Sequence, residues 1–84
     1  MTKVRITKEA AEQLEGLQEP HHARMLRLFD RLERWPEISG AKALSGDLAG
    51  WYRMRSGDYR LRFFVKGADV VVDKIGHRRD FCEG

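Results

Sequence analysis

The stretch WYRMRSGDYRLRF, residues 51–63, sets the register of a β-hairpin and therefore the two faces of a sheet. Glycine followed by aspartate is typical of a two-residue hairpin loop, so we expect Gly57 and Asp58 to join two antiparallel strands. The facing pairs are then Ser56 with Tyr59, Arg55 with Arg60, Met54 with Leu61, Arg53 with Arg62, and Tyr52 with Phe63. A slip by one residue would mix apolar and charged side chains on both faces. The two-residue loop is predicted because it separates them cleanly.

One face of this hairpin, which we call the arginine face, carries Arg53, Arg55, Arg60 and Arg62. Like charges that face each other directly destabilise a sheet by up to ~1 kcal/mol, and a local conflict of this kind is tolerated mainly where function requires it. Guanidinium groups bind phosphate through two parallel hydrogen bonds and keep their charge at neutral pH. The pattern favours a site for nucleic acid, with a merely solvated basic surface as the alternative.

A third strand is expected at residues 70–75, after a turn with Gly67 and Ala68 at its tip. Strict alternation pairs Val65 with Val70, Phe63 with Val72, Arg62 with Asp73, and Arg60 with Ile75. Continued further, alternation sends His77 to the arginine face. Imidazole is the side chain best suited to exchange protons near neutral pH, so His77 is a candidate acid or base for RNA cleavage without a metal. A histidine simply exposed at the strand end is the alternative.

The N-terminal half predicts a strand and a helical hairpin. Val4 and Ile6 alternate with charged residues in residues 3–7, which indicates a short strand with one buried face. Apolar residues then recur at helical spacing over residues 8–17 and 20–35, and prolines delimit the second helix. Together with the three-stranded antiparallel meander, these elements predict an α+β fold whose helices pack on the apolar face of the sheet.

Length and composition limit the classes of protein that remain. The chain has 84 residues, which suits one domain, and residues 37–50 form a connector rich in glycine and serine. The net charge of +3 permits an anionic partner without requiring one. Cys82 is the only cysteine and the carboxylates are scattered, so we expect no disulfide, metal or cofactor. No apolar run approaches the ~20 residues that cross a bilayer, so we expect a cytoplasmic protein without membrane contact.

Several aromatic residues and histidines have a predictable side of the sheet or helix. Trp51 falls on the arginine face, where its indole could stack on a nucleobase or pack against the sheet edge. Tyr52 and Tyr59 fall on the apolar face. His21 and His22 stand at the start of the second helix without the i, i+4 spacing of helical metal ligands, and we expect both in solvent.

Two segments carry a resemblance to a known family. Residues 41–64, AKALSGDLAGWYRMRSGDYRLRFF, and residues 70–81, VVVDKIGHRRDF, resemble characteristic segments of the RelE/ParE superfamily of bacterial toxins from type II toxin–antitoxin modules. The resemblance covers nearly the whole chain and implies one RelE-like toxin domain at residues 1–84. It implies a metal-independent endoribonuclease that cleaves messenger RNA in the ribosomal A site and so inhibits translation. A cognate antitoxin protein would hold the toxin inactive.

The resemblance also implies roles for individual residues. Arg60 and Arg78 would hold the scissile phosphate, and His77 or one of the basic residues would transfer protons. Arg53 and Arg55 would bind RNA and stabilise the transition state. Further candidate RNA-binding residues are Trp51, Arg79 and Phe81.

The sequence departs from the family pattern near the C-terminus. Many members carry a catalytic tyrosine after the GHRR motif, whereas Cys82 stands at that position here and Phe81 precedes it. Phe81 could stack on a base but cannot transfer a proton. Two alternatives therefore stay open: a ParE-like toxin that binds DNA gyrase, and a catalytically impaired RNA-binding relative. The basic hairpin and the GHRR motif favour the RNase branch.

Overall fold

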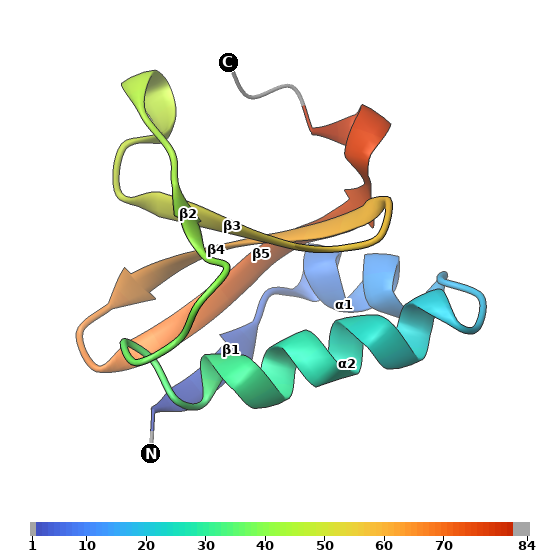
Figure 1. Ribbon diagram of the computed structural model, residues 1–84, viewed down its shortest axis with the longest axis horizontal. Coiled ribbons are helices and arrows are strands. Elements are labelled where there is room, and N and C mark those ends of the chain that lie inside the picture. Colours follow the sequence, from blue (N-terminus) through green and yellow to red (C-terminus); the bar gives the residue numbers. More distant parts are fainter. Residues whose placement is uncertain (1, 82–84) are drawn as a thin grey trace.

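The computed structural model describes residues 2–81, which form a five-stranded sheet with two helices on one face (Figure 1). The strands are β1 (Lys3–Ile6), β2 (Lys42–Ala43), β3 (Trp51–Ser56), β4 (Tyr59–Lys66) and β5 (Asp69–His77). The helices are α1 (Lys8–Glu15) and α2 (His21–Leu32), and the short 3₁₀ helices are η1 (Gly46–Leu48) and η2 (Arg78–Asp80). The order across the sheet is β1-β5-β4-β3-β2. Within the described part of the chain only β1 and β5 pair in parallel, and the predicted α+β architecture is confirmed.

The hairpin of β3 and β4 has the predicted register in every facing pair. Gly57 occupies the first loop position with φ of 62°, a conformation that glycine adopts without the steric penalty of other residues. Met54, Leu61 and Phe63 are all buried on the helix side. The arginines of both strands therefore lie on the opposite face, as predicted.

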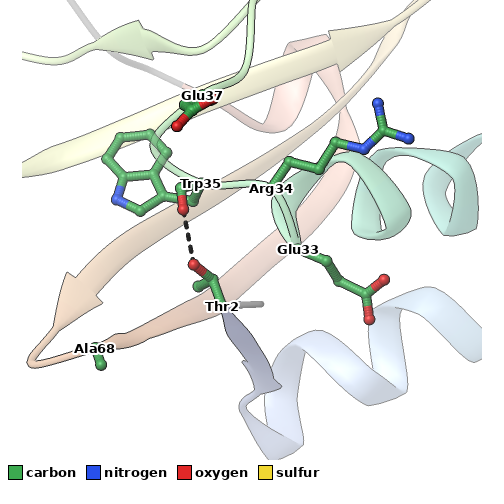
Figure 2. A pocket seen from close by; sticks show the side chains of 6 residues that line it. All are labelled: Thr2, Glu33, Arg34, Trp35, Glu37 and Ala68. Carbon is green, nitrogen blue, oxygen red and sulfur yellow. Dashed lines mark hydrogen bonds between the residues drawn. The ribbon is translucent and has the colours of Figure 1, made fainter.

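The chain that leaves α2 is fixed to the start of β1 (Figure 2). The Thr2 hydroxyl donates to the Trp35 carbonyl at 2.7 Å, and the Thr2 N–H donates to the Glu33 carbonyl at 3.0 Å. The helix itself ends at Leu32, slightly earlier than predicted, and residues 33–36 form turns. These contacts hold the Trp35 ring edge-on to Phe63, with ring centroids 5.4 Å apart.

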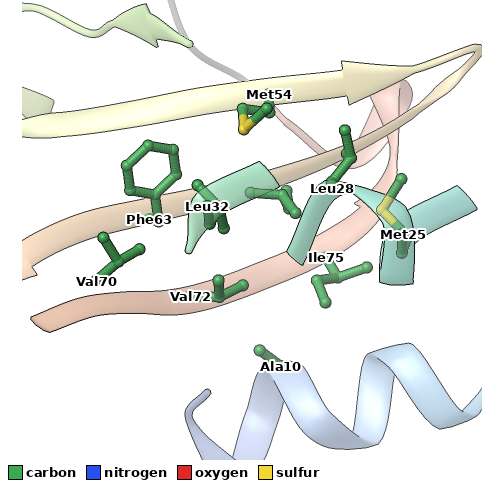
Figure 3. Close-up of a cluster of buried hydrophobic side chains, with 10 residues drawn as sticks. Ala10, Met25, Leu28, Leu32, Met54, Phe63, Val70, Val72 and Ile75 are labelled. Atoms are coloured by element: carbon green, nitrogen blue, oxygen red, sulfur yellow. The ribbon is translucent and has the colours of Figure 1, made fainter. Parts of the chain in front are cut away.

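The hydrophobic core lies between the two helices and the apolar face of the sheet (Figure 3). Its buried members are Ala10, Met25, Leu28, Leu32, Met54, Leu61, Phe63, Val70, Val72 and Ile75. Full burial of a large apolar side chain stabilises the fold by roughly 1.5–3 kcal/mol relative to exposure. Both helices thus pack on the apolar face of the sheet, and the arginine face lies on the opposite side.

The strand β5 departs from strict alternation at Asp73. Phe63 faces Val72 as predicted, but the next facing pair is Arg62 with Lys74, so Asp73 is an extra residue in the strand. Such a β-bulge places two residues of one strand opposite one residue of its partner. Every later residue of β5 consequently points to the face opposite to the one predicted.

The bulge corrects two predictions about the end of β5. The facing pairs beyond it are Leu61 with Ile75, Arg60 with Gly76, and Tyr59 with His77. Ile75 is therefore buried in the core instead of facing Arg60, and His77 lies on the tyrosine side instead of the arginine face. Among the described residues, no strand flanks this part of β5 on its β1 side. There the side-chain oxygen of Gln13 accepts a hydrogen bond from the Ile75 N–H at 2.8 Å.

Two smaller differences concern the edges of the sheet. The connector at residues 37–50 contains β2, a two-residue strand that pairs with β3 and was not predicted. Ile6 was predicted on a buried face but is 36% exposed, because β1 is the edge strand and pairs on one side only. Within residues 2–81 no helix is long and apolar enough to span a membrane.

Candidate nucleic-acid interface

Four rows of residues cross the arginine face, because facing residues on neighbouring strands point to the same side. The row nearest the β3–β4 loop consists of Arg55, Arg60 and Gly76, and the middle row of Lys42, Arg53, Arg62 and Lys74. The third row consists of Trp51, Phe64, Val71 and Arg5, and a fourth of Lys66, Asp69 and Lys3. The segments around η1 and η2 lie on this side of the sheet and the helices α1 and α2 on the other (Figure 1). The face is thus cationic over two rows and aromatic over part of the third.

Arg62 is bound by a carboxylate of the neighbouring strand β5. Its Nε donates to Oδ1 of Asp73 at 3.0 Å, and its Nη2 donates to Oδ2 at 2.7 Å. The predicted contact of opposite charges is therefore confirmed, although the residue facing Arg62 is Lys74. The Arg62 guanidinium also lies 4.9 Å from the ring centroid of Trp51, which packs edge-on against Phe64. Arg62 and Trp51 thus stabilise the sheet through contacts within the protein.

Replacing Asp73 with alanine should lower the free energy of unfolding by about 1.5–3 kcal/mol, the contribution of hydrogen bonds to a charged group. The Arg62 side chain, 21% exposed, would lose its bidentate carboxylate partner. Urea unfolding followed by circular dichroism measures the change. The control is Asp30→Ala on the exposed surface of α2, where a change within about 0.5 kcal/mol is expected. Equal effects of the two substitutions would contradict the structural role of the pair.

Three further arginines of the face, Arg53, Arg55 and Arg60, are brought together as predicted. Arg55 is exposed and faces the half-buried Arg60 across the hairpin. The third member of this row is Gly76, so no side chain of β5 stands next to Arg60. Arg53 and Arg55 line a surface pocket together with Lys42. The three arginines provide a surface where several guanidinium groups can reach one polyanion.

The C-terminal end of the described chain folds over β5 on the arginine side. Phe81 is only 7% exposed, and the Lys74 ammonium lies 4.7 Å from its ring centroid. Lys74 also donates to the Asp80 carbonyl at 2.5 Å. A Cβ added to Gly76 would lie 3.3 Å from a carboxylate oxygen of Asp80, so a side chain here would require this turn to shift. The Phe81 ring is therefore buried in this structure and not presented for base stacking, and Cys82 lies outside the described residues.

His77 points toward the helix side, at the rim of the core. Its ring lies edge-on to Tyr59 with centroids 5.3 Å apart, and its Nδ1 accepts a hydrogen bond from the Arg79 N–H at 3.2 Å. The same Tyr59 ring stacks on His21, with centroids 4.2 Å apart. The prediction that His21 lies in solvent is therefore wrong, because the aromatic ring of β4 attracts it into a packed contact.

Arg78 and Arg79 are exposed on η2, at the loop end of the sheet. The Arg78 N–H donates to the Asp58 carbonyl at 2.7 Å, and its Nε lies 3.8 Å from an oxygen of the Asp58 carboxylate. These contacts fix η2 against the β3–β4 loop, next to the row of Arg55 and Arg60. The predicted site is thus assembled in part: the arginines gather at one end of the arginine face, whereas His77 is turned away from it.

Lys42 and Lys74 are basic residues of this face, next to the predicted arginines, that were missed from the sequence. Lys42 faces Arg53 from β2, and Lys74 faces Arg62 from β5. A two-residue strand has no alternation to recognise, and the position of Lys74 depends on the bulge. No group of three or more histidine, cysteine or acidic side chains able to hold a metal ion occurs among residues 2–81.

A second pocket, of about 680 Å³, lies at the C-terminal end of α2 (Figure 2). Its lining consists of Thr2, Glu33, Arg34, Trp35, Glu37 and Ala68, so both signs of charge are present. None of the predicted site residues contributes to it. We therefore place the candidate interface on the arginine face alone.

Comparisons with known proteins agree with the fold. The sequence model of the family described as "ParE toxin of type II toxin-antitoxin system, parDE" matches residues 4–80. The fold and the motifs together define a toxin of the RelE/ParE superfamily, which confirms the resemblance noted in the sequence. The chain belongs to the ParE toxin family of type II toxin–antitoxin systems.

Solved structures of toxin–antitoxin proteins share this fold. A chain of the RelBE2 toxin–antitoxin complex from Mycobacterium tuberculosis is 31% identical, with a TM-score of 0.79 over 92% of this chain and 91% of that chain. A chain of the archaeal RelE–RelB complex from Pyrococcus horikoshii OT3 is also 31% identical, with a TM-score of 0.72 over 93% and 97% of the two chains. The isolated Escherichia coli RelE toxin, 16% identical over 92% and 84% of the chains, has a TM-score of 0.76 and shows likeness of fold alone. A search of curated protein sequences gave no match.

Proposed function

We propose that this toxin is a metal-independent endoribonuclease that cleaves messenger RNA in the ribosomal A site and thereby inhibits translation in the cytoplasm. The observation that carries the proposal is the arrangement of Arg53, Arg55 and Arg60 on one face of a sheet whose other face is buried. A sheet packed on a hydrophobic core is a rigid support, so the backbone positions of these three arginines are fixed relative to one another before RNA binds. The similarity to a RelBE2 chain and to a RelE–RelB chain also supports this proposal.

The proposed chemistry uses positive charge in place of a metal. Arg60 and Arg78 hold the phosphodiester, while Arg53 and Arg55 bind the RNA strand and stabilise the extra negative charge of the pentacoordinate transition state. The 2′-oxygen attacks the adjacent phosphorus and the bond from phosphorus to the 5′-oxygen breaks. The products are a 2′,3′-cyclic phosphate and a 5′-hydroxyl group, to which the 2′-hydroxyl proton is finally transferred. Arg79 adds positive charge at the edge of the site.

Replacing His77 with alanine should change the rate of RNA cleavage by no more than about threefold, whereas loss of a proton-transferring group costs roughly 10²–10⁴-fold. The reason is geometric, since the His77 ring packs against Tyr59 and not on the arginine face. Primer extension on a translated reporter measures the rate, and His22→Ala serves as the control. A hundredfold loss of cleavage rate in a variant with an unchanged circular dichroism spectrum would show that His77 does transfer protons.

We also propose a cognate antitoxin protein as the partner that keeps the toxin inactive. The RelBE2 and RelE–RelB structures are toxin–antitoxin complexes, and both contain a chain 31% identical to this one. A protein that covers the arginine face would block access of RNA to the site. Extended or helical segments that wrap around the toxin are the expected means.

A second candidate function is the poisoning of DNA gyrase by binding, as expected of a ParE-like toxin. The matching family description, which names ParE toxins, favours it. In this case the basic surface would contact gyrase or its DNA and would cleave no RNA. A folded RNA-binding relative without catalytic activity is the remaining alternative from the sequence.

Mapping RNA ends in a bacterial translation extract separates these functions. Addition of the toxin should produce cuts at codon positions in a translated reporter, with no cuts in a matched reporter whose start codon is destroyed. Cuts in both reporters would contradict ribosome dependence. Intact messages together with DNA damage in expressing cells would support gyrase poisoning. Intact messages without toxicity, from a protein shown to be folded, would support the impaired relative.

A further inference from the structure

A basic pocket lies at the β2 edge of the arginine face. Its volume is about 420 Å³, and its lining consists of Gly40, Lys42, Arg53 and Arg55. Lys42 and Arg53 face each other on neighbouring strands, and Arg55 follows two residues later on the same side of β3. Among residues 2–81, the lining supplies three cationic side chains and no carboxylate or large apolar group. This chemistry suits an anion that is bound through hydrogen bonds and charge.

The segment around Gly40, which lines this pocket, is held in place by a side chain from α2 on the other side of the sheet. An Arg31 guanidinium nitrogen from α2 donates to the Ser39 carbonyl, immediately before Gly40. Gly40 itself has φ of 87°, and a Cβ there would lie 3.1 Å from the same Arg31 group. The Leu44 N–H then donates to the Trp51 carbonyl at 2.9 Å, which continues the pairing of the connector with β3. Lys42 is therefore positioned by contacts on both sides of it in the chain.

We propose that this pocket binds a second phosphodiester of the same RNA strand, next to the one held at Arg55 and Arg60, with Lys42 as a direct ligand. The inference rests on the proposed function, because it requires RNA on the arginine face. Arg55 lines the pocket and also faces Arg60 at the first phosphate site, and neighbouring strands lie only ~4.8 Å apart. An RNA strand that crosses from β4 to the β2 edge would bring consecutive phosphates to the two places. Base identity plays no part in this contact, so the pocket contributes affinity and alignment.

Binding of a short fluorescent 2′-O-methyl oligouridine tests the proposal without depending on cleavage, because this RNA has no free 2′-hydroxyl. Lys42→Ala should weaken binding several-fold and reduce the slope of log affinity against log salt by about 0.7, the value for one phosphate contact to a single strand. Lys42→Arg should restore the slope. Lys8→Ala, an equal loss of charge on the exposed surface of α1, should leave the slope unchanged.

A titration of ¹⁵N-labelled protein with the same oligouridine locates the contact. Amide resonances of Gly40 and Lys42 should shift together with those of Arg53 and Arg55. Equal salt slopes for Lys42→Ala and Lys8→Ala, or an unshifted Gly40 resonance, would overturn the second phosphate site. Shifts caused by polyglutamate and not by oligouridine would overturn it in favour of an acidic protein segment.

The outcome also separates this inference from the proposed function. If messages are cut in the translation extract while Lys42→Ala keeps the wild-type salt slope, the second phosphate site is wrong and the endoribonuclease stands. If no message is cut but binding depends on Lys42, the site stands and the endoribonuclease proposal is wrong.

Discussion

The Arg60→Ala variant is expected to cleave messenger RNA roughly 10²–10³-fold more slowly, the loss typical of removing one group that stabilises transition-state charge. Arg60 faces Arg55 across the hairpin and has Gly76 as its neighbour on β5, so the phosphate would meet two guanidinium groups here. Gly76 has no side chain that could replace Arg60 on this side of the phosphate. Primer extension on a translated reporter, under single-turnover conditions, measures the rate.

Two further variants show whether the effect belongs to this position. Arg27→Ala removes the same charge from the exposed surface of α2, on the other side of the sheet, and should cleave like the wild type. Arg60→Lys should be intermediate, because an ammonium group keeps the charge but lacks the planar pair of donors. Equal rates for Arg60→Ala and Arg27→Ala would remove Arg60 from the site.

The Phe63→Ala variant should lose about 3–5 kcal/mol of unfolding free energy, the usual cost of deleting a buried phenyl ring. Phe63 is fully buried, lies between Tyr52 and Val72 in the sheet, and contacts Trp35. The loss is a large part of the roughly 5–15 kcal/mol that stabilises a typical domain. Urea unfolding followed by circular dichroism measures it.

The next residue along the same strand provides a matched control. Phe64 points to the arginine face, where it is half-buried and packs edge-on against Trp51. Phe64→Ala should therefore cost only about 1 kcal/mol, the value of an aromatic contact at a partly exposed position. Similar losses for the two variants would contradict the assignment of one buried and one open face.

The hairpin could be predicted from the sequence because two independent signals agree there. The Gly57-Asp58 loop limits the register, and only that register separates the apolar side chains from the arginines. The same reasoning predicts the cationic surface from the sequence. A strongly patterned segment with a short loop leaves few alternatives.

The end of β5 could not be predicted because a bulge is invisible in the alternation of residues. Asp73 is polar and sits where a polar residue was expected, so nothing in the sequence marks it as an extra residue. The predictions of the face on which Ile75 and His77 lie were both wrong because of this bulge. The site was therefore predictable on β3 and β4, whose register was certain, and not on β5.

The strand β2 and the position of His21 illustrate a different limit. Lys42–Ala43 becomes a strand only by pairing with β3, and His21 is packed only because Tyr59 is nearby in space. Both depend on contacts between segments that are distant along the chain. Local sequence patterns do not encode such contacts.

The extra residue in β5 also determines how this chain should be aligned with its relatives. A relative that lacks the bulge needs a one-residue gap near Asp73, and without that gap every later position would be matched to a side chain on the wrong side of the strand. The roles assigned to residues of the GHRR motif depend on the placement of this gap. An alignment shifted by one position would match Gly76 to the residue that corresponds to His77.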